Sequence, residues 1–127
     1  MKKAFTLVEV LLVVGIIALL TSIAIPNILK IKIISNDAYA QSSLRNIGTA
    51  IESYYHASSG TYPTDVADLT DNATPPYLTR DYFSSAVAGF NYTPVLASDS
   101  YVITAAPVGV GRTGSTTFTI STGGVLQ

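Results

Sequence analysis

The sequence contains no cysteine and no tryptophan, and only 12% of its 127 residues are charged. Without cysteine, disulfides, thiolate catalysis and thiolate-bound metals are excluded, so stability outside a cell must come from packing or assembly. The seven lysines and arginines are scattered along the chain. Because binding to phosphate backbones requires several clustered cations, we expect no specific nucleic acid as a partner.

The motifs that carry enzymatic chemistry are also missing. His56 is the only histidine, and no serine occupies a strand-to-helix elbow beside a base. Residues 109–114 fit GxGxxG, but a Thr-rich strand follows instead of a helix, which favours a hairpin loop over a dinucleotide site. Asp65, Asp68 and Asp71 offer too few oxygens for calcium. We therefore expect no enzyme, no cofactor and no metal.

The hydrophobic residues are concentrated near the N-terminus. Phe5 to Leu29 form a run of 25 residues in which Glu9 alone is ionisable, and about 20 apolar residues are enough to cross a bilayer as a helix. Lys2 and Lys3 precede the run, and basic residues tend to stay in the cytoplasm. The pattern predicts a single-pass segment with its N-terminus in the cytoplasm and the rest of the chain outside.

A secretory signal peptide is the simplest alternative, because a basic start followed by an apolar stretch is typical of one. SIA at 22–24 and AYA at 38–40 resemble its cleavage site, but neither explains Glu9. A carboxylate costs about 2.5 to 3.5 kcal/mol at the centre of a membrane helix, and less near an end. Glu9 either reaches the headgroup boundary or has a cationic partner, and cleavage between Ala4 and Phe5 would create a suitable amine.

The stretch FTLVEVLLVVGIIALLTSIAIPN, with its basic leader, resembles the N-terminus of type IV pilins and of the related pseudopilins of type II secretion. The resemblance implies that a prepilin peptidase cleaves between Ala4 and Phe5 and methylates the new amine of Phe5. It also implies that Glu9 meets this amine on a neighbouring subunit of a filament. Pro26 matches the helix-breaking proline of the family, whereas Ala4 departs from the glycine that usually precedes the cut.

The residues after the apolar run predict a longer helix with a globular head. Ala40, Leu44, Ile47, Ile51 and Tyr54 recur at intervals of three and four, which is typical of one helical face. The expected helix extends from 5 to 59, where Gly60 ends it. We divide the chain into a leader (1–4), a transmembrane or filament-core helix (5–29), an amphipathic continuation (30–59) and a globular head (60–127).

The head is expected to contain a loop and a small sheet. Asp65 can cap a short helix from Val66 to Leu69. From Gly89 onward, β-branched and aromatic residues alternate with small polar ones, which predicts three or four antiparallel strands. The fold class is therefore α+β and pilin-like. Its inner sheet face, expected to cover the helical stripe, consists of Phe90, Tyr92, Tyr101, Ile103, Phe118 and Ile120.

Gly15 and Pro26 mark the weak part of the long helix. Glycine adds backbone freedom, and proline removes a backbone donor and clashes with the preceding turn. As filaments of this family often have an extended strand here, we expect local unwinding around Thr21 to Pro26 after assembly.

Taken together, the sequence predicts a structural subunit of a type IV pilus for adhesion or motility. It would sit in the inner-membrane lipid, meet prepilin peptidase and the pilus assembly machinery, and polymerise with its own copies into an extracellular filament. One alternative is a type II secretion pseudopilin, although the C-terminal STGGVLQ lacks the carboxylates with which some pseudopilins bind calcium. Another is a monomeric membrane-anchored or secreted binding domain in which Glu9 is incidental.

Overall fold

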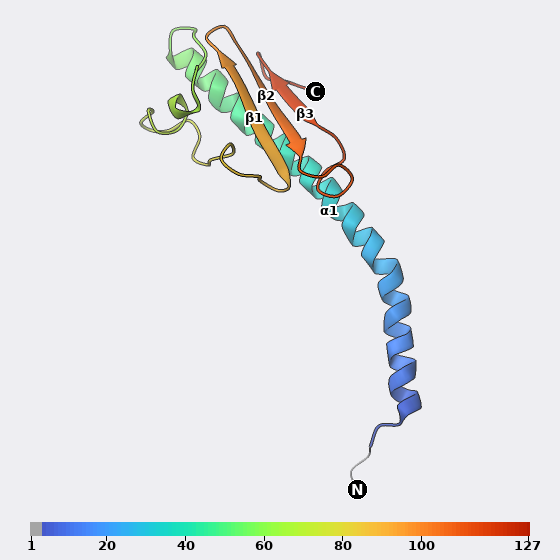
Figure 1. The fold of residues 1–127 in the computed structure, drawn as a ribbon. Helices are drawn as coiled ribbons and strands as arrows, with labels where there is room; N and C mark the ends of the chain where they lie inside the picture. The colour runs from blue at the N-terminus through green and yellow to red at the C-terminus, as the bar shows by residue number, and fades with distance from the viewer. Residues whose placement is uncertain (1–3) are drawn as a thin grey trace. The chain divides into compact units, whose positions relative to one another are not determined.

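The computed structural model describes residues 4–127, and its longest element is the helix α1, Leu7–Ala57 (Figure 1). Thr6 is the residue that caps this helix. Its carbonyl accepts from the N–H of Val10 at 3.2 Å, and its hydroxyl accepts from the N–H of Glu9 at 3.3 Å. The helix expected from 5 to 59 is therefore confirmed, two residues shorter at each end.

Two residues with left-handed backbone end the helix. Ser59 has φ 58° and Gly60 has φ 85°. The N–H of Gly60 donates to the carbonyl of Tyr55 at 3.0 Å, the long-range bond of a Schellman motif. Gly60 thus ends the helix as expected. Ser59 also adopts the left-handed conformation, which is unfavourable for a residue with a side chain.

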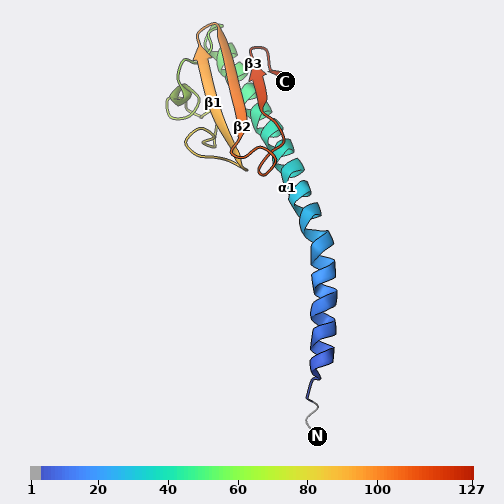
Figure 2. The same ribbon diagram turned by 45° about the vertical axis from the view of Figure 1, so that its right-hand side comes forward.

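The chain divides into two compact units, Met1–Lys32 and Ile33–Gln127. In the first unit every described residue, from Ala4 to Lys32, is exposed. In the second unit the remaining part of α1 packs against the sheet (Figures 1 and 2).

The sheet has four antiparallel strands in the order β1-β2-β3-β4. These are β1, Phe90–Ala97; β2, Ser100–Pro107; β3, Phe118–Ser121; and β4, Val125–Leu126. Phe90 pairs with Pro107, and Ile103 pairs with Ile120, so alternate residues share one face. The expected α+β fold is confirmed, with four strands.

The core lies between this sheet face and the apolar stripe of α1. Five of the six expected sheet residues are buried, whereas Phe118 is half-buried. The helical stripe is equally well buried up to Ile51, and Tyr54 is half-buried at its end. The buried residues that form the two facing layers are Ala40, Leu44, Ile47, Ile51, Phe90, Tyr92, Tyr101, Ile103 and Ile120.

The connection from α1 to the sheet contains the short helix η1, Val66–Asp68, which is a 3-10 turn rather than the expected helix through Leu69. Asp65 accepts from the N–H of Ala67 at 3.0 Å, and Asp68 accepts from the N–H of Asp65 at 3.3 Å, so the two aspartates form a capping box. Buried Leu69 and Leu78 then anchor the loop to the core.

The loop between β2 and β3 is fastened to α1. Asn36 donates from Nδ2 to the carbonyl of Thr113 at 2.8 Å, and Asp37 accepts from the N–H of Ser115 at 2.9 Å. At Gly114 a Cβ would lie 2.3 Å from an aromatic carbon of β1. Gly114, the last glycine of the GxGxxG match, is therefore needed for close packing. The match lies in a loop, as the sequence predicts.

The carboxylate of Glu52 joins α1 to three other segments. It accepts hydrogen bonds from the hydroxyl of Tyr101 at 3.0 Å, from the hydroxyl of Tyr62 at 3.3 and 3.4 Å, and from the N–H of Gly123 at 3.0 Å. The Tyr101 hydroxyl in turn accepts from the N–H of Gly124 at 3.2 Å. Burial, followed by the hydrogen bond to Glu52 and its negative charge, raises the pKa of Tyr101 above that of an ordinary tyrosine.

Candidate assembly surface

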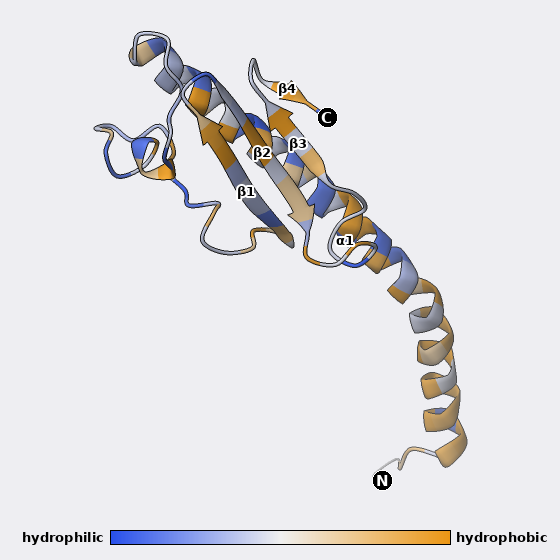
Figure 3. Cartoon of the chain, turned by 45° about the horizontal axis from the view of Figure 1, so that its top comes forward, coloured by the Kyte–Doolittle hydropathy of each residue, from blue (hydrophilic) through white to orange (hydrophobic). Residues whose placement is uncertain are grey.

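The first half of α1 presents an apolar surface that no described part of the chain covers. Its large hydrophobic side chains are each between 49% and 76% exposed, and Figure 3 shows this part of the helix as predominantly hydrophobic. By length and composition α1 can cross a membrane. Such a surface requires lipid or another apolar partner. The residues that form it from Leu7 to Leu29 are Leu7, Val8, Val10, Leu11, Leu12, Val13, Val14, Ile16, Ile17, Leu19, Leu20, Ile23, Ile25, Ile28 and Leu29.

Glu9 lies in the first turn of α1, as the third residue after the Thr6 cap. A carboxylate is favoured there because the unpaired N–H groups and the helix dipole give this end a partial positive charge. Sequence reasoning found Glu9 but missed Thr6. The spacing T-x-x-E at 6–9 is the signal that could have found it, because it is typical of a capping box.

Ala4 and Phe5 precede the helix in exposed chain that belongs to no helix or strand, and the Phe5 side chain is 79% exposed. The peptide bond between them therefore lies outside α1, and no helix has to unwind for a peptidase to reach it. Phe5 and Glu9 both border an apolar surface depression of about 260 Å³ at the start of α1. It is lined by Phe5, Glu9, Val10, Val13 and Val14.

Gly15 and Pro26 are both inside α1, which is helical on either side of each. A Cβ added at Gly15 would meet nothing within 4 Å, so packing within the chain does not require glycine there. Near Pro26, the Thr21 hydroxyl donates to the carbonyl of Ile17 at 2.7 Å. Unwinding around Thr21 to Pro26 concerns the assembled state and stays a prediction.

The other residues weighed from the sequence have local structural contacts. The ring of His56 packs edge-to-face on Tyr55, with centroids 5.7 Å apart. Asp65 and Asp68 form the cap of η1. Within residues 4–127 no three His, Cys, Asp or Glu side chains are grouped so as to hold a metal ion.

The fold and this surface define a pilin-like chain: a long N-terminal helix with an exposed apolar first part, followed by a four-stranded antiparallel sheet. The comparison with curated proteins agrees. Over 54 residues the chain is 40% identical to the type IV major pilin protein PilA of Myxococcus xanthus (strain DK1622). The match covers 42% of this chain and 24% of that protein. No protein-family model matches the chain, and no solved structure does. The chain is similar to a type IV pilin.

Proposed function

We propose that the protein is the structural subunit of a type IV pilus, held in the inner membrane before assembly and polymerised through the first part of α1. The observation that carries this proposal is the exposed apolar surface from Leu7 to Leu29. The similarity to a type IV major pilin supports it. The partner of this surface would be lipid first and the same helix of other copies afterwards.

Processing would precede assembly. Prepilin peptidase would cleave between Ala4 and Phe5 and methylate the Phe5 amine. The exposed, non-helical chain at this bond supports access by a peptidase. The exposed Phe5 side chain would then begin the mature chain, next to the helix cap.

Glu9 would set the position of one subunit relative to the next. In the membrane, association of apolar helices gains little from the hydrophobic effect, because lipid tails are as apolar as leucine. Packing and polar pairing must therefore favour the filament. A carboxylate in its dry core requires a cation, and the methylated amine of Phe5 on a neighbouring subunit would supply it.

The test is Glu9→Val, with Ser22→Ala as the matched control. Ser22 lies in the same exposed segment, and its hydroxyl bonds only within α1, to the carbonyl of Leu19 at 2.8 Å. Both variants should partition into membranes as the unaltered chain does. Glu9→Val should leave no filaments in the pellet after shearing and centrifugation, whereas Ser22→Ala should leave a normal pellet.

Two measurements separate the parts of this proposal. A normal filament yield from Glu9→Val would contradict the docking role of Glu9. A chain that never pellets after shearing, even unaltered, would contradict the filament itself and would favour a monomeric anchored domain. Mass spectrometry of the N-terminal peptide tests processing independently, because a methylated Phe5 terminus is the expected product.

A further inference from the structure

Arg80 is fixed in place on the surface of the head by two tyrosine rings. Its guanidinium carbon lies 5.8 Å from the ring centre of Tyr39 on α1 and 5.7 Å from that of Tyr82. The guanidinium also donates a hydrogen bond to the Tyr39 hydroxyl. Stacking and hydrogen bonding together hold the planar group in one orientation, so a ligand would not have to order it.

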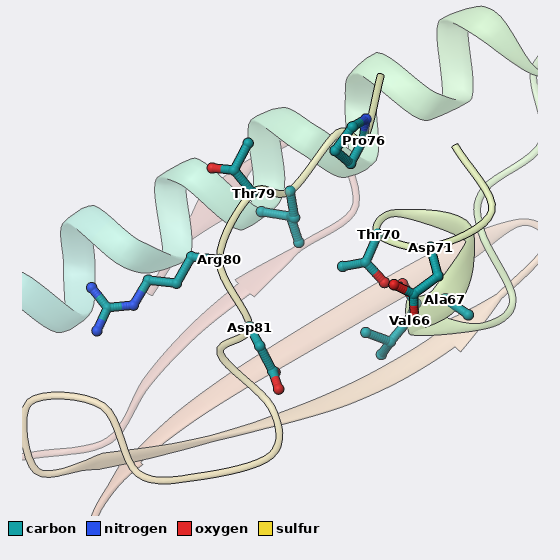
Figure 4. Close-up of a pocket in the computed structure, with 9 residues that line it drawn as sticks. Val66, Ala67, Thr70, Asp71, Pro76, Thr79, Arg80 and Asp81 are labelled. Carbon is teal, nitrogen blue, oxygen red and sulfur yellow. The ribbon is translucent and has the colours of Figure 1, made fainter. Parts of the chain in front are cut away.

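This arginine has no acidic partner among residues 4–127, although the second unit carries seven acidic residues and three arginines. The adjacent Asp81 faces elsewhere. It accepts from the hydroxyl and N–H of Ser84 and from the N–H of Phe83, and these hydrogen bonds lower the pKa of its carboxyl. Figure 4 shows the guanidinium of Arg80 and the carboxylate of Asp81 pointing in different directions. Arg80 is therefore available to an external anion.

A polar groove of about 300 Å³ lies beside Arg80, between α1 and residues 77–82. On the helix side Asn46, Thr49 and Ser53 line it. The Thr49 and Ser53 hydroxyls donate to α1 carbonyls at 2.8 and 2.7 Å, which leaves their oxygen lone pairs as acceptors. Arg80 is the only charged residue in the lining.

The opposite wall contributes an aromatic surface. Tyr77 is half-buried, and its ring is held edge-to-face by Tyr54 with centroids 5.7 Å apart. The groove is thus lined by one amide, three Ser and Thr hydroxyls, two tyrosine rings and one guanidinium without an acidic partner: Asn46, Thr49, Ser53, Thr79, Tyr77, Tyr82 and Arg80. Hydroxyl groups, a weakly apolar ring face and a carboxylate are the complementary features of a uronic-acid sugar.

We propose that this groove binds an acidic saccharide. Arg80 pairs with the carboxylate of one sugar residue, and Asn46, Thr49 and Ser53 exchange hydrogen bonds with sugar hydroxyls along the groove, while the ring of a further sugar residue rests on Tyr77. A nucleic acid is the less suitable ligand because several cations are needed to neutralise its phosphates, and the groove supplies one. The site lies in the second unit and does not depend on filament assembly.

The experiment measures binding of trigalacturonate to the full chain by isothermal titration calorimetry. A polyoxyethylene detergent keeps the chain in solution without adding sugar. Maltotriose, sodium acetate and a short oligothymidylate serve as comparison probes. We expect trigalacturonate to bind, more weakly at high salt, and at least about tenfold more tightly than maltotriose, the loss corresponding to one charge-assisted pair.

Variants locate the site. Arg80→Gln should weaken trigalacturonate binding about tenfold, and Arg80→Lys should weaken it less, because lysine keeps the charge but not the planar fork. Arg112→Gln removes the same charge from the exposed loop between β2 and β3 and should change nothing. Asn46→Asp, at an exposed helix position, should weaken trigalacturonate binding by repulsion without touching the core, so the test survives a misfolded Arg80 variant.

Three results would overturn the proposal. Equal affinity for trigalacturonate and acetate would mean an anion site without sugar recognition. Tighter binding of the oligothymidylate would mean a nucleic-acid surface. Equal losses from Arg80→Gln and Arg112→Gln would mean that the net charge of the head, rather than this groove, attracts the ligand.

Discussion

Replacement of Glu52 by alanine should destabilise the head by about 2 to 3 kcal/mol, the range expected when a buried hydroxyl loses a hydrogen bond to a charged acceptor. The main loss is the 3.0 Å bond from Tyr101, which is 1% exposed. The Tyr62 bonds are longer, at 3.3 and 3.4 Å, and the N–H of Gly123 is exposed, so water can replace its partner. The loss of the Tyr62 and Gly123 hydrogen bonds should therefore add little to the destabilisation.

The assay is urea unfolding of the full chain in a nonionic detergent, followed by tyrosine fluorescence and near-ultraviolet circular dichroism. The sequence has eight tyrosines and no tryptophan, and all eight lie in the second unit, so the signal reports on the head. The midpoint should fall while the slope stays constant, which indicates a change in stability alone. Arg45→Ala, an exposed change on the same helix, should shift the free energy of unfolding by no more than about 0.5 kcal/mol.

A double-mutant cycle of Glu52→Ala with Tyr101→Phe measures the interaction between the carboxylate and the hydroxyl directly. If the carboxylate and the hydroxyl act as a pair, the two substitutions together should cost less than their sum by about 1 kcal/mol or more. Purely additive losses, or an unchanged midpoint in Glu52→Ala, would show that the Glu52 hydrogen bonds do not hold the sheet to α1.

Two further changes test other parts of the fold. The pKa of Tyr101 is raised chiefly by burial, so the native head should keep its full stability below about pH 10, where unfolded tyrosines begin to ionise, and lose it as the pH rises further. Urea midpoints across this range check the sign, and a constant midpoint would refute it. Ser59→Gly should stabilise the head by about 0.5 to 1 kcal/mol in the same assay, because glycine adopts the left-handed backbone without a side-chain penalty. A loss of stability would show that the Ser59 side chain makes a compensating contact.

The parts of the fold that follow local periodicity could be predicted from the sequence. Spacing of three and four from Ala40 to Ile51 identified the buried face of α1, and alternation after Gly89 identified the inner face of the sheet. In both cases burial of a side chain depends on its neighbours in sequence. The end of the helix was also predictable from the local sequence, because Gly60 readily adopts the left-handed backbone that ends a helix.

The polar contacts that fasten the head could not be predicted in this way. Glu52 bonds to Tyr101, 49 residues away, and to Gly123, 71 residues away. Asp37 bonds to Ser115, 78 residues away. A single sequence shows a polar residue on a helix in each case, but the partner depends on the register of the sheet and the path of a loop. The groove beside Arg80 belongs to the same class, since Tyr39 and Arg80 meet only in the folded chain.

The position of Glu9 in the helix follows from the local sequence, whereas its proposed partner belongs to another copy of the chain. A test of its role has to separate these two contributions. In the single chain Glu9 occupies the third position after the Thr6 cap, where glutamate and glutamine are both suitable residues. In a dry filament core only the charged form can pair with a cationic amine. Glu9→Gln therefore removes the charge and keeps a side chain suited to this position of the helix, whereas Glu9→Val removes both. We expect Glu9→Gln to be deficient in sheared filaments at unchanged membrane content. Filaments that form with glutamine and fail with valine would assign Glu9 to the helix cap, and the docking contact would have to be sought elsewhere on the apolar surface.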